Sequence, residues 1–346
     1  MSRCSTAVVG IAGTALGAEE RALFADQPPA GFILFKRNCA EPAQLRALTA
    51  ELKALFPDRW VPILVDQEGG RVQRLAAPQW PAVPALRRVG ELAERDPAAG
   101  EAAARLHATA IACMLRDAGL DVVCAPCLDL LRPETTSAIG DRAFAADPAL
   151  VGRLGRVYAE TLLAHGVVPV IKHLPGHGRA TVDSHLELPR VTATRVELEA
   201  TDFVAFLPLT APPLGQRLLA MTAHIVFDAI DPSRPATQSP VVIDEVIRGR
   251  IGYRGLLLSD DLSMEALAGP IETRALASLA AGCDLALHCN GELEEMAAVL
   301  AAVPALDATA CERLQALAPA RVAPVAAQGD VLAELEYRLG HGVTGV

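Results

Sequence analysis

The stretch 171–189 reads IKHLPGHGRATVDSHLELP and holds a dense group of side chains that can bind hydroxyls or move protons. An apolar run at 166–171 (GVVPVI) leads into it, and the following PGHG sequence excludes a long continuation of strand or helix. Titratable groups on a loop that a rigid strand holds at one end are typical of catalytic sites. We therefore predict an enzyme's active-site loop rather than a structural histidine-rich turn, with these candidate residues: Lys172, His173, His177, Asp183 and His185.

A second acidic motif, GLLLSDDLSM at 255–264, places two carboxylates directly after an apolar strand. Neighbouring side chains on an extended chain point in opposite directions, so we expect only one of them to face a ligand. Alternation alone does not decide which one. We predict that Asp260 is presented and that Asp261 caps the following helix.

Apolar runs alternate with helical patterns along the chain, which is typical of a parallel barrel surrounded by helices. Strands are predicted at Ala7–Ile11, Gly31–Phe35, Val61–Val65, Asp121–Ala125, Val167–Ile171, Leu218–Thr222, Gly255–Leu258 and Asp284–His288. Helices are predicted at Glu41–Leu55, Ala98–Ala118, Leu150–His165, Arg195–Phe206, Val242–Arg250, Ile271–Ala281 and Glu292–Ala302. The predicted fold is α/β: a single (β/α)8 TIM-type barrel over about residues 5–305 with additional C-terminal helices over about 306–346, in one domain, 1–346.

In such a barrel, functional side chains follow the C-terminal ends of the strands. Polar residues follow seven of the predicted strands, in this order: Asn38, Asp66, Asp129, Lys172 with His173, His224, Asp260 and Asn290. For Asp129 and Asn290, helix capping is an equally good explanation. Together these positions predict one mouth lined with polar groups that bind hydroxyls.

Composition narrows the class of partner. The chain has 346 residues, 51% hydrophobic and 21% charged, and a formal net charge of −10. Because no basic patch accompanies this charge, we expect neither nucleic acid nor a membrane as partner, and a small neutral or sugar-like substrate instead.

The eight cysteines are scattered, several within apolar runs, and predict reduced thiols and a cytoplasmic protein. The pair Cys124 and Cys127 has CxxC spacing but lies in a strand-like segment without a second pair, so we interpret it as core packing. The N-terminal apolar run has the outline of a secretory signal, but residues 7–11 are needed as the first strand.

The motifs KHLPGHGRATVDSHLELP and GLLLSDDLSMEAL together resemble the bacterial family 3 glycoside hydrolases, in particular the β-N-acetylhexosaminidases of peptidoglycan recycling. Further similar motifs follow in the family's order over most of residues 5–300: GFILFKRN, VDQEGGRVQRL, APCLDL, AIGDRAF, MTAHIVFDAIDP and AGCDLALHCN. The chain departs from the family pattern at Leu174, where Phe is common, and at Arg179, where Asp is often seen.

The resemblance implies a retaining exo-β-N-acetylglucosaminidase that removes terminal N-acetylglucosamine from muropeptide or anhydro-muropeptide fragments through a covalent glycosyl-Asp intermediate. Asp260 would be the nucleophile, and Asp183 with His185 the general acid/base pair. The substrate-binding positions that it implies are Asp66, Arg74, Arg142, Lys172 and His173. We expect no metal and no cofactor, and a monomer or weak homo-oligomer. Because the acid/base pair lies on a glycine-containing loop, we expect this loop to move when substrate binds.

Three alternatives remain open. His173, His177, Asp183 and His185 have the residue types of a zinc site, which would make the chain a metal-dependent barrel hydrolase. A non-catalytic sugar-binding barrel would explain Asp66, Arg74 and Lys172, but not a carboxylate that converges with an Asp/His pair. Within the enzyme class, the acetamide group of the sugar could attack in place of Asp260.

Overall fold

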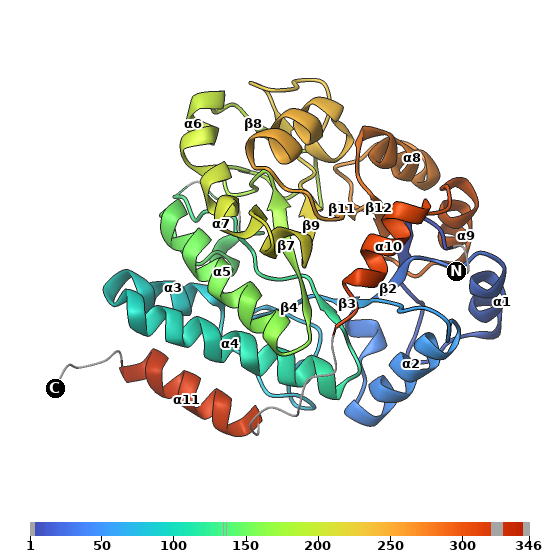
Figure 1. Cartoon of the computed structure of the whole chain (residues 1–346), viewed down its shortest axis with the longest axis horizontal. Coiled ribbons are helices and arrows are strands. Elements are labelled where there is room, and N and C mark those ends of the chain that lie inside the picture. Colours follow the sequence, from blue (N-terminus) through green and yellow to red (C-terminus); the bar gives the residue numbers. More distant parts are fainter. Residues whose placement is uncertain (1–3, 134, 136, 320–327, 342–346) are drawn as a thin grey trace.

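Eight parallel strands close into a barrel at the centre of the structure (Figure 1). The structure is a computed structural model that describes residues 4–133, 135, 137–319 and 328–341. In spatial order around the barrel the strands are β1 (Ala7–Val9), β12 (Leu285–His288), β11 (Leu257–Asp261), β9 (Leu219–Thr222), β7 (Val168–Leu174), β6 (Val122–Val123), β3 (Ile63–Val65) and β2 (Gly31–Leu34). Each of them lies within or overlaps a predicted strand, and the (β/α)8 barrel is confirmed.

The apolar pattern of the strands explains the closed shape. Alternate residues point into the barrel, where Ile33, Leu64, Val122, Val170 and Leu258 belong to one buried cluster. The residues between them face the surrounding helices and belong to a larger cluster. Strands that are buried on both faces need continuous apolar runs, and this is the pattern in the sequence.

Helices surround the barrel (Figure 1). The α-helices up to the last barrel strand are α1 (Ala18–Asp26), α2 (Pro42–Ala54), α3 (Leu86–Arg95), α4 (Pro97–Asp117), α5 (Pro148–Ala164), α6 (Arg195–Ala200), α7 (Leu207–Thr210) and α8 (Ile271–Ala281). Helix α9 (Leu293–Ala302) follows β12. Asp96 and Asp147 accept backbone N–H groups at the starts of α4 and α5, and Pro stands at the first turn of each.

Shorter elements complete the chain. Two small sheets pair β4 (Gln67–Gly69) with β5 (Val72–Gln73) and β8 (Arg190–Val191) with β10 (Val226–Phe227). The 3₁₀ turns are η1 (Lys36–Asn38), η2 (Gly140–Arg142), η3 (Asp202–Phe206), η4 (Leu214–Gln216) and η5 (Ala236–Gln238). Segment η6 (Val242–Arg250) is a π-helix where an ordinary helix was predicted.

The structure differs from the predicted helices in two further places. Helix α3 was not predicted, and the predicted helix Arg195–Phe206 is divided at Thr201, whose backbone leaves helical geometry. The division turns Asp202 inward, where its buried carboxylate accepts hydrogen bonds from Arg132 and Arg179. Tertiary ion pairing therefore overrides the local helical pattern.

The predicted C-terminal helices are present. Helix α10 (Ala308–Ala316) places Leu314 in the cluster that fills the barrel interior, so α10 closes the end where the strands begin. Helix α11 (Gln328–His341) lies along α4 (Figure 1), and Arg88 and Glu336 pair between α3 and α11. The opposite end of the barrel, where the strands end, is left for the site.

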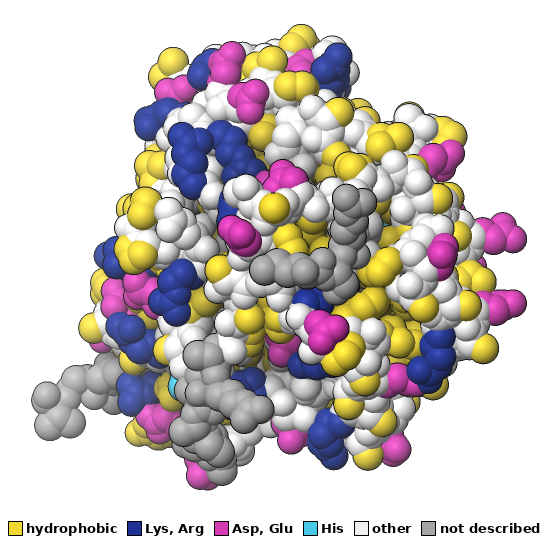
Figure 2. All heavy atoms as spheres, turned by 45° about the vertical axis from the view of Figure 1, so that its right-hand side comes forward, with side chains coloured by type: hydrophobic (Ala, Val, Ile, Leu, Met, Phe, Trp, Pro, Cys, Tyr) yellow, Lys and Arg dark blue, Asp and Glu magenta, His cyan; other side chains and the backbone are white. Residues whose placement is uncertain are grey.

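The surface and the thiols fit the composition. In Figure 2, acidic and basic side chains both occur across the face shown, with apolar side chains between them. All eight cysteines are free thiols, and Cys124 lies in the barrel interior, which confirms its packing role. Within the described ranges, no helix combines the length and apolar character that a membrane span requires.

Candidate active site

A cavity of about 350 Å³ opens at the C-terminal ends of the barrel strands. All of the residues predicted as site residues line it: Asp66, Arg74, Arg142, Lys172, His173, Asp183, His185 and Asp260. They lie directly after β3 and β5, in η2, β7 and β11, and in the loop after β7, so the barrel closure brings distant segments together.

Asp66, Arg74, Arg142 and Lys172 line the cavity and, with the buried Glu68 behind them, form a network that we call the charged floor. Lys172 Nζ lies 2.9 Å from Asp66 Oδ1 and 2.6 Å from Glu68 Oε1. Arg74 Nη2 lies 2.9 Å from Asp66 Oδ2, and Arg142 binds both oxygens of Glu68 at 2.8 and 2.9 Å. Every acidic group here contacts two cations, which compensates the cost of burying charge.

The ion pairs fix the charge states of the floor. Burial opposes ionisation of Glu68, but Arg142 and Lys172 outweigh it and lower the pKa of this carboxyl to about 2. The pKa of Asp66 is lowered in the same way, against its burial, by Lys172 and Arg74. Burial opposes the charge on Lys172, yet Asp66 and Glu68 raise its pKa. The floor therefore presents fixed charges that can accept and donate hydrogen bonds to hydroxyl groups.

A tight hairpin, β4–β5, supplies Arg74. Its turn contains Gly69 at φ +93° and Gly70 at φ +58°. A Cβ at Gly69 would lie 2.2 Å from the Pro84 carbonyl oxygen, so only glycine fits. The Gln67 side chain accepts N–H groups of Arg74 and Leu75, and the Arg74 guanidinium lies over the Phe35 ring. These contacts hold Arg74 in place against Asp66.

The paired acids at the end of β11 differ from the expectation. Both Asp260 and Asp261 line the cavity, because the strand register shifts between Leu258 and Asp261 and interrupts the regular alternation. Asp261 does not cap a helix: it accepts Ser263 N–H, Ser263 Oγ–H and Cys289 N–H. Asp261 thus shapes the turn after the strand.

Asp260 accepts fewer hydrogen bonds than Asp261. It accepts one hydrogen bond, from Asp261 N–H. Burial raises its pKa, but His173 and His224 outweigh this, and overall the pKa lies below the ordinary value. A buried, ionised carboxylate at a strand end has the properties of a nucleophile.

The second predicted pair, Asp183 and His185, lies on the 180–188 loop. His185 donates its backbone N–H to Asp183 Oδ1, and its Nδ1 lies 2.8 Å from the same oxygen. Burial raises the pKa of Asp183, but the two hydrogen bonds from His185 lower it overall. The His185 side chain is 65% exposed, in contrast to the buried floor. This bond orients the ring and leaves its other nitrogen for proton transfer.

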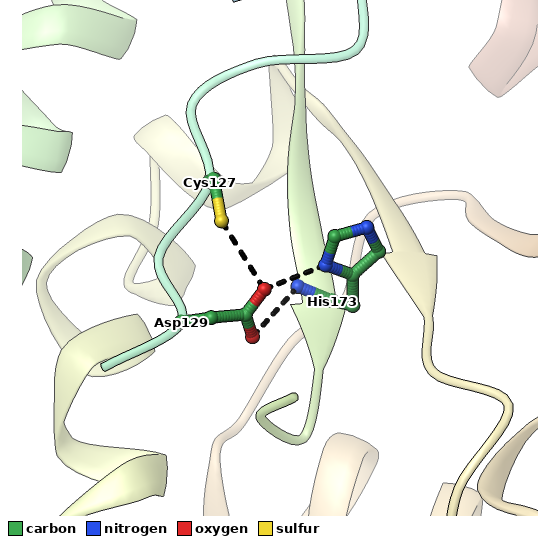
Figure 3. Close-up of side chains that lie close together, drawn as sticks. All are labelled: Cys127, Asp129 and His173. Carbon is green, nitrogen blue, oxygen red and sulfur yellow. Dashed lines mark hydrogen bonds and ion pairs between the residues drawn. The ribbon is translucent and has the colours of Figure 1, made fainter. Parts of the chain in front are cut away.

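His173 is held from below by Asp129, a residue for which helix capping was an open explanation. Asp129 is fully buried and caps no helix; its Oδ2 lies 2.6 Å from His173 Nδ1 (Figure 3). Cys127 also donates to Asp129 Oδ2, consistent with burial raising the pKa of this thiol. His173 Nε2 faces Arg142, so the Nδ1 proton points to Asp129.

The residues of the alternative metal site do not converge. His177 Nε2 contacts Ser184 Oγ, and His185 contacts Asp183. In the described part of the chain, the one group with three potential ligand atoms within 4.8 Å of one another is Cys127, Asp129 and His173. Both oxygens of Asp129 in this group already accept hydrogen bonds.

Not every polar residue that was predicted to follow a strand lines the cavity. Asn38 binds the carbonyl groups of Ile11 and Gly13, and His224 bonds Thr237 and the Asp261 carbonyl. Sequence reasoning missed Glu68. A signal was available, because Asp66 and Glu68 are two residues apart and extended chains place such residues on one side.

The fold and the site together define a class of protein. A closed barrel carries at its C-terminal mouth an ionised carboxylate, an Asp–His pair and a charged floor suited to hydroxyls. A carboxylate and a proton donor around one hydroxyl-binding site are the arrangement of a glycosidase.

Comparison with known proteins gives the family. Residues 7–323 match the model of the glycosyl hydrolase family 3 N terminal domain. A protein from Alkalilimnicola ehrlichii named "Beta-hexosaminidase" is 44% identical over 312 residues, which are 89% of this chain and 86% of that protein. The chain belongs to glycosyl hydrolase family 3 and is a glycoside hydrolase, as its motifs indicated.

Solved structures are also similar to this chain over nearly its whole length. NagZ from Neisseria gonorrhoeae in complex with N-trifluoroacetyl-D-glucosamine superimposes with a TM-score of 0.85 at 33% identity, covering 98% of each chain. NagZ from the same organism in complex with zinc ion superimposes with a TM-score of 0.84 at 30% identity, covering 99% of each chain.

Proposed function

We propose that the protein is a retaining exo-β-N-acetylglucosaminidase that releases terminal N-acetylglucosamine from muropeptide or anhydro-muropeptide fragments during cell-wall recycling. One observation carries the proposal: the carboxylate of Asp260 and the Asp183–His185 pair, from separate parts of the chain, line the same cavity. A retaining enzyme needs these two functions, one at the anomeric carbon and one at the leaving oxygen.

In the first step, Asp260 attacks the anomeric carbon and forms a covalent glycosyl ester. Its lowered pKa keeps it ionised at neutral pH, and its place at the end of β11 limits its motion. Positive charge develops on the sugar ring in the transition state, and the buried carboxylate stabilises it.

His185 supplies the proton that the departing oxygen needs. Asp183 holds the Nδ1 side of the ring, so the Nε2 side is free to donate and later to accept a proton from water. The same imidazole thus acts as acid in the first step and as base in the second. Water then releases the sugar from Asp260 with net retention of configuration.

The charged floor would bind the sugar hydroxyls. Lys172 and Arg74 donate, Asp66 accepts, and Arg142 and His173 lie beside them on the cavity wall. Apolar side chains, including Met221, Met264 and Leu287, also line the cavity and suit the methyl group of an acetamide. The names of the relatives and the ligand of the N. gonorrhoeae protein support an N-acetylated sugar.

We also propose that residues 1–346 act as one domain, as a monomer or weak homo-oligomer in the cytoplasm. The eight free thiols support the location, because the cytoplasm keeps cysteines reduced.

The direct test compares chromogenic β-N-acetylglucosaminide with the corresponding β-glucoside. We expect the N-acetylated substrate to be hydrolysed with the higher kcat/KM and with retention, observed by NMR of the first-formed anomer. Equal rates on both substrates would contradict the sugar assignment, and inversion would contradict the mechanism.

Chelator treatment tests the metal-dependent alternative in the same assay. We expect full activity after dialysis against a chelator, because the proposed steps use only side chains of the chain. Activity that is lost on dialysis and restored by zinc would favour the alternative.

A further inference from the structure

One buried carboxylate lies behind two separate parts of the cavity wall. Asp129 accepts four hydrogen bonds: His173 Nδ1 at 2.6 Å, His173 N at 3.3 Å, His177 N at 2.6 Å and Cys127 Sγ at 3.2 Å. Figure 3 shows the first of these, which orients the His173 ring. The bond to His177 N extends the contacts of Asp129 along the chain toward the 180–188 loop.

His177 continues the connection through its side chain. Its Nε2 lies 3.0 Å from Ser184 Oγ, and the residues are each only 3% exposed. Burial, with His173 adding to it, lowers the pKa of His177 to about 4, so the ring is neutral at pH 7. Its Nδ1 has no hydrogen-bond partner in the described structure, so Ser184 is the ring's one polar attachment there.

Ser184 is the central residue of the Asp183–Ser184–His185 tripeptide. Its side chain points inward to His177, whereas the His185 side chain is 65% exposed. Among the described residues, the Ser184–His177 bond is the one side-chain hydrogen bond that links the 180–188 loop to the rest of the protein. The tripeptide is compact, since His185 bonds Asp183 twice, so a displaced Ser184 would carry both neighbours with it.

The segment before the loop is anchored independently. Thr135 Oγ donates to the Gly178 carbonyl, and Arg179 pairs with buried Asp202 at 2.7 Å. These contacts fix the chain up to Arg179, including the position where this sequence departs from the family pattern. Beyond that point, the His177–Ser184 contact is the one side-chain hydrogen bond among the described residues that ties Asp183 and His185 to the rest of the protein.

We propose that Asp129, His177 and Ser184 form a positioning relay that sets the Asp183–His185 pair over the cavity and couples it to the orientation of His173. The relay rests on the proposed function, in which His185 is the general acid. None of the three residues performs the chemistry in this scheme. Asp129 holds the backbone of His177, His177 holds Ser184, and Ser184 holds the residues on either side of it.

The test separates positioning of the acid from general damage by using leaving groups of different basicity. A poor leaving group needs protonation by His185 and a dinitrophenyl group needs little. We expect Ser184→Ala to lower kcat/KM at least ~10-fold on a poor leaving group and less than ~3-fold on the dinitrophenyl substrate, part of the ~10²–10⁴-fold effect of a general acid. Ser184→Thr, which keeps the hydroxyl, should recover most of the difference.

Two further variants control for folding. Ser278→Ala removes a buried hydroxyl on α8 that donates to the Arg274 carbonyl away from the cavity, and it should leave both substrates unaffected. His177→Phe keeps a ring but loses Nε2, and it should reproduce the pattern of Ser184→Ala. It keeps the proposal testable if Ser184→Ala does not fold.

The outcomes distinguish this proposal from the proposed function. If His185→Ala discriminates between the leaving groups and Ser184→Ala and His177→Phe do not, the relay is wrong and the acid role stands. If His185→Ala itself loses activity equally on both substrates, the acid role fails and the relay fails with it. A Ser184→Ala/His185→Ala double variant no worse than His185→Ala alone supports the relay, and additive losses contradict it.

Discussion

The charged floor and the 180–188 loop face the same cavity but are built in opposite ways. In the floor, Lys172 and Glu68 have side chains that are 3% and 1% exposed and are joined by ion pairs. In the loop, His185 is 65% exposed and Leu186 is 75% exposed. Binding and attack gain from fixed charges in a dry setting, whereas proton delivery to a leaving group needs access to solvent.

This difference also predicts that the 180–188 loop opens more easily than the charged floor. The floor residues are joined to one another by ion pairs and cannot separate without exposing paired charges. The 180–188 loop has few buried contacts, so it can open at low cost while the barrel stays folded. A rigid floor with a movable acid is consistent with the expectation that the loop moves on substrate binding, which stays a prediction.

The largest expected effect is at Asp260, which lines the same cavity from the end of β11. Asp260→Asn keeps the size of the side chain and removes the attacking charge, so kcat should fall by several orders of magnitude on every substrate. Steady-state kinetics with good and poor leaving groups measures this. Residual activity above one tenth of the wild-type rate would contradict the assignment of Asp260.

On the loop side, His185→Ala should cost ~10²–10⁴-fold on poor leaving groups and much less on activated aryl groups. The loss caused by Asp260→Asn, in contrast, should not depend on the leaving group. This difference separates proton donation by the loop from attack by the carboxylate at the end of β11. Equal losses across leaving groups would show that His185 is not the acid.

Thermodynamic stability gives the third comparison. Glu68→Gln leaves Arg142 without its buried carboxylate and Lys172 with Asp66 alone, and it should lower the free energy of unfolding by about 3 kcal/mol, measured with urea. Leu186→Ala is the matched loop control, and its effect should lie within ~0.5 kcal/mol because the side chain is exposed. Similar losses in both variants would remove the distinction between floor and loop.

The smallest effect is on the pH dependence of stability. The folded pKa of Glu68, about 2, lies below its ordinary value of 4.5, so its contribution is full above pH 4.5 and is lost as pH falls toward 2. Unfolding free energies measured over this range should therefore decline more steeply for the wild type than for Glu68→Gln. Parallel curves would show that Glu68 has no lowered pKa in the fold.

Much of the architecture could be predicted because it depends on repeated local patterns. Each barrel strand lies in or overlaps a short apolar run, and glycines at 119 and 166 adopt the positive φ that glycine favours directly after helices α4 and α5. The division at Thr201 could not be predicted, because it depends on where Arg132 and Arg179 lie in space relative to Asp202.

The site, too, has a part that the sequence could predict and a part that it could not. Motifs indicated which residues face the cavity, and the structure places them there. The residues behind them depend on tertiary contacts: Asp129 is joined to His173 and His177 by hydrogen bonds that span 44 and 48 positions of sequence. The side-by-side position of Asp260 and Asp261 depends on a register shift in β11, which strict alternation does not anticipate.

The most direct test of the account is to trap the intermediate with a 5-fluoro N-acetylglucosaminyl fluoride, which retains the acetamide group and slows hydrolysis of the ester. We predict a covalent adduct by mass spectrometry on the peptide that contains Asp260, and none for Asp260→Asn. Turnover of the reagent without any adduct, or an adduct on another residue, would contradict attack by Asp260.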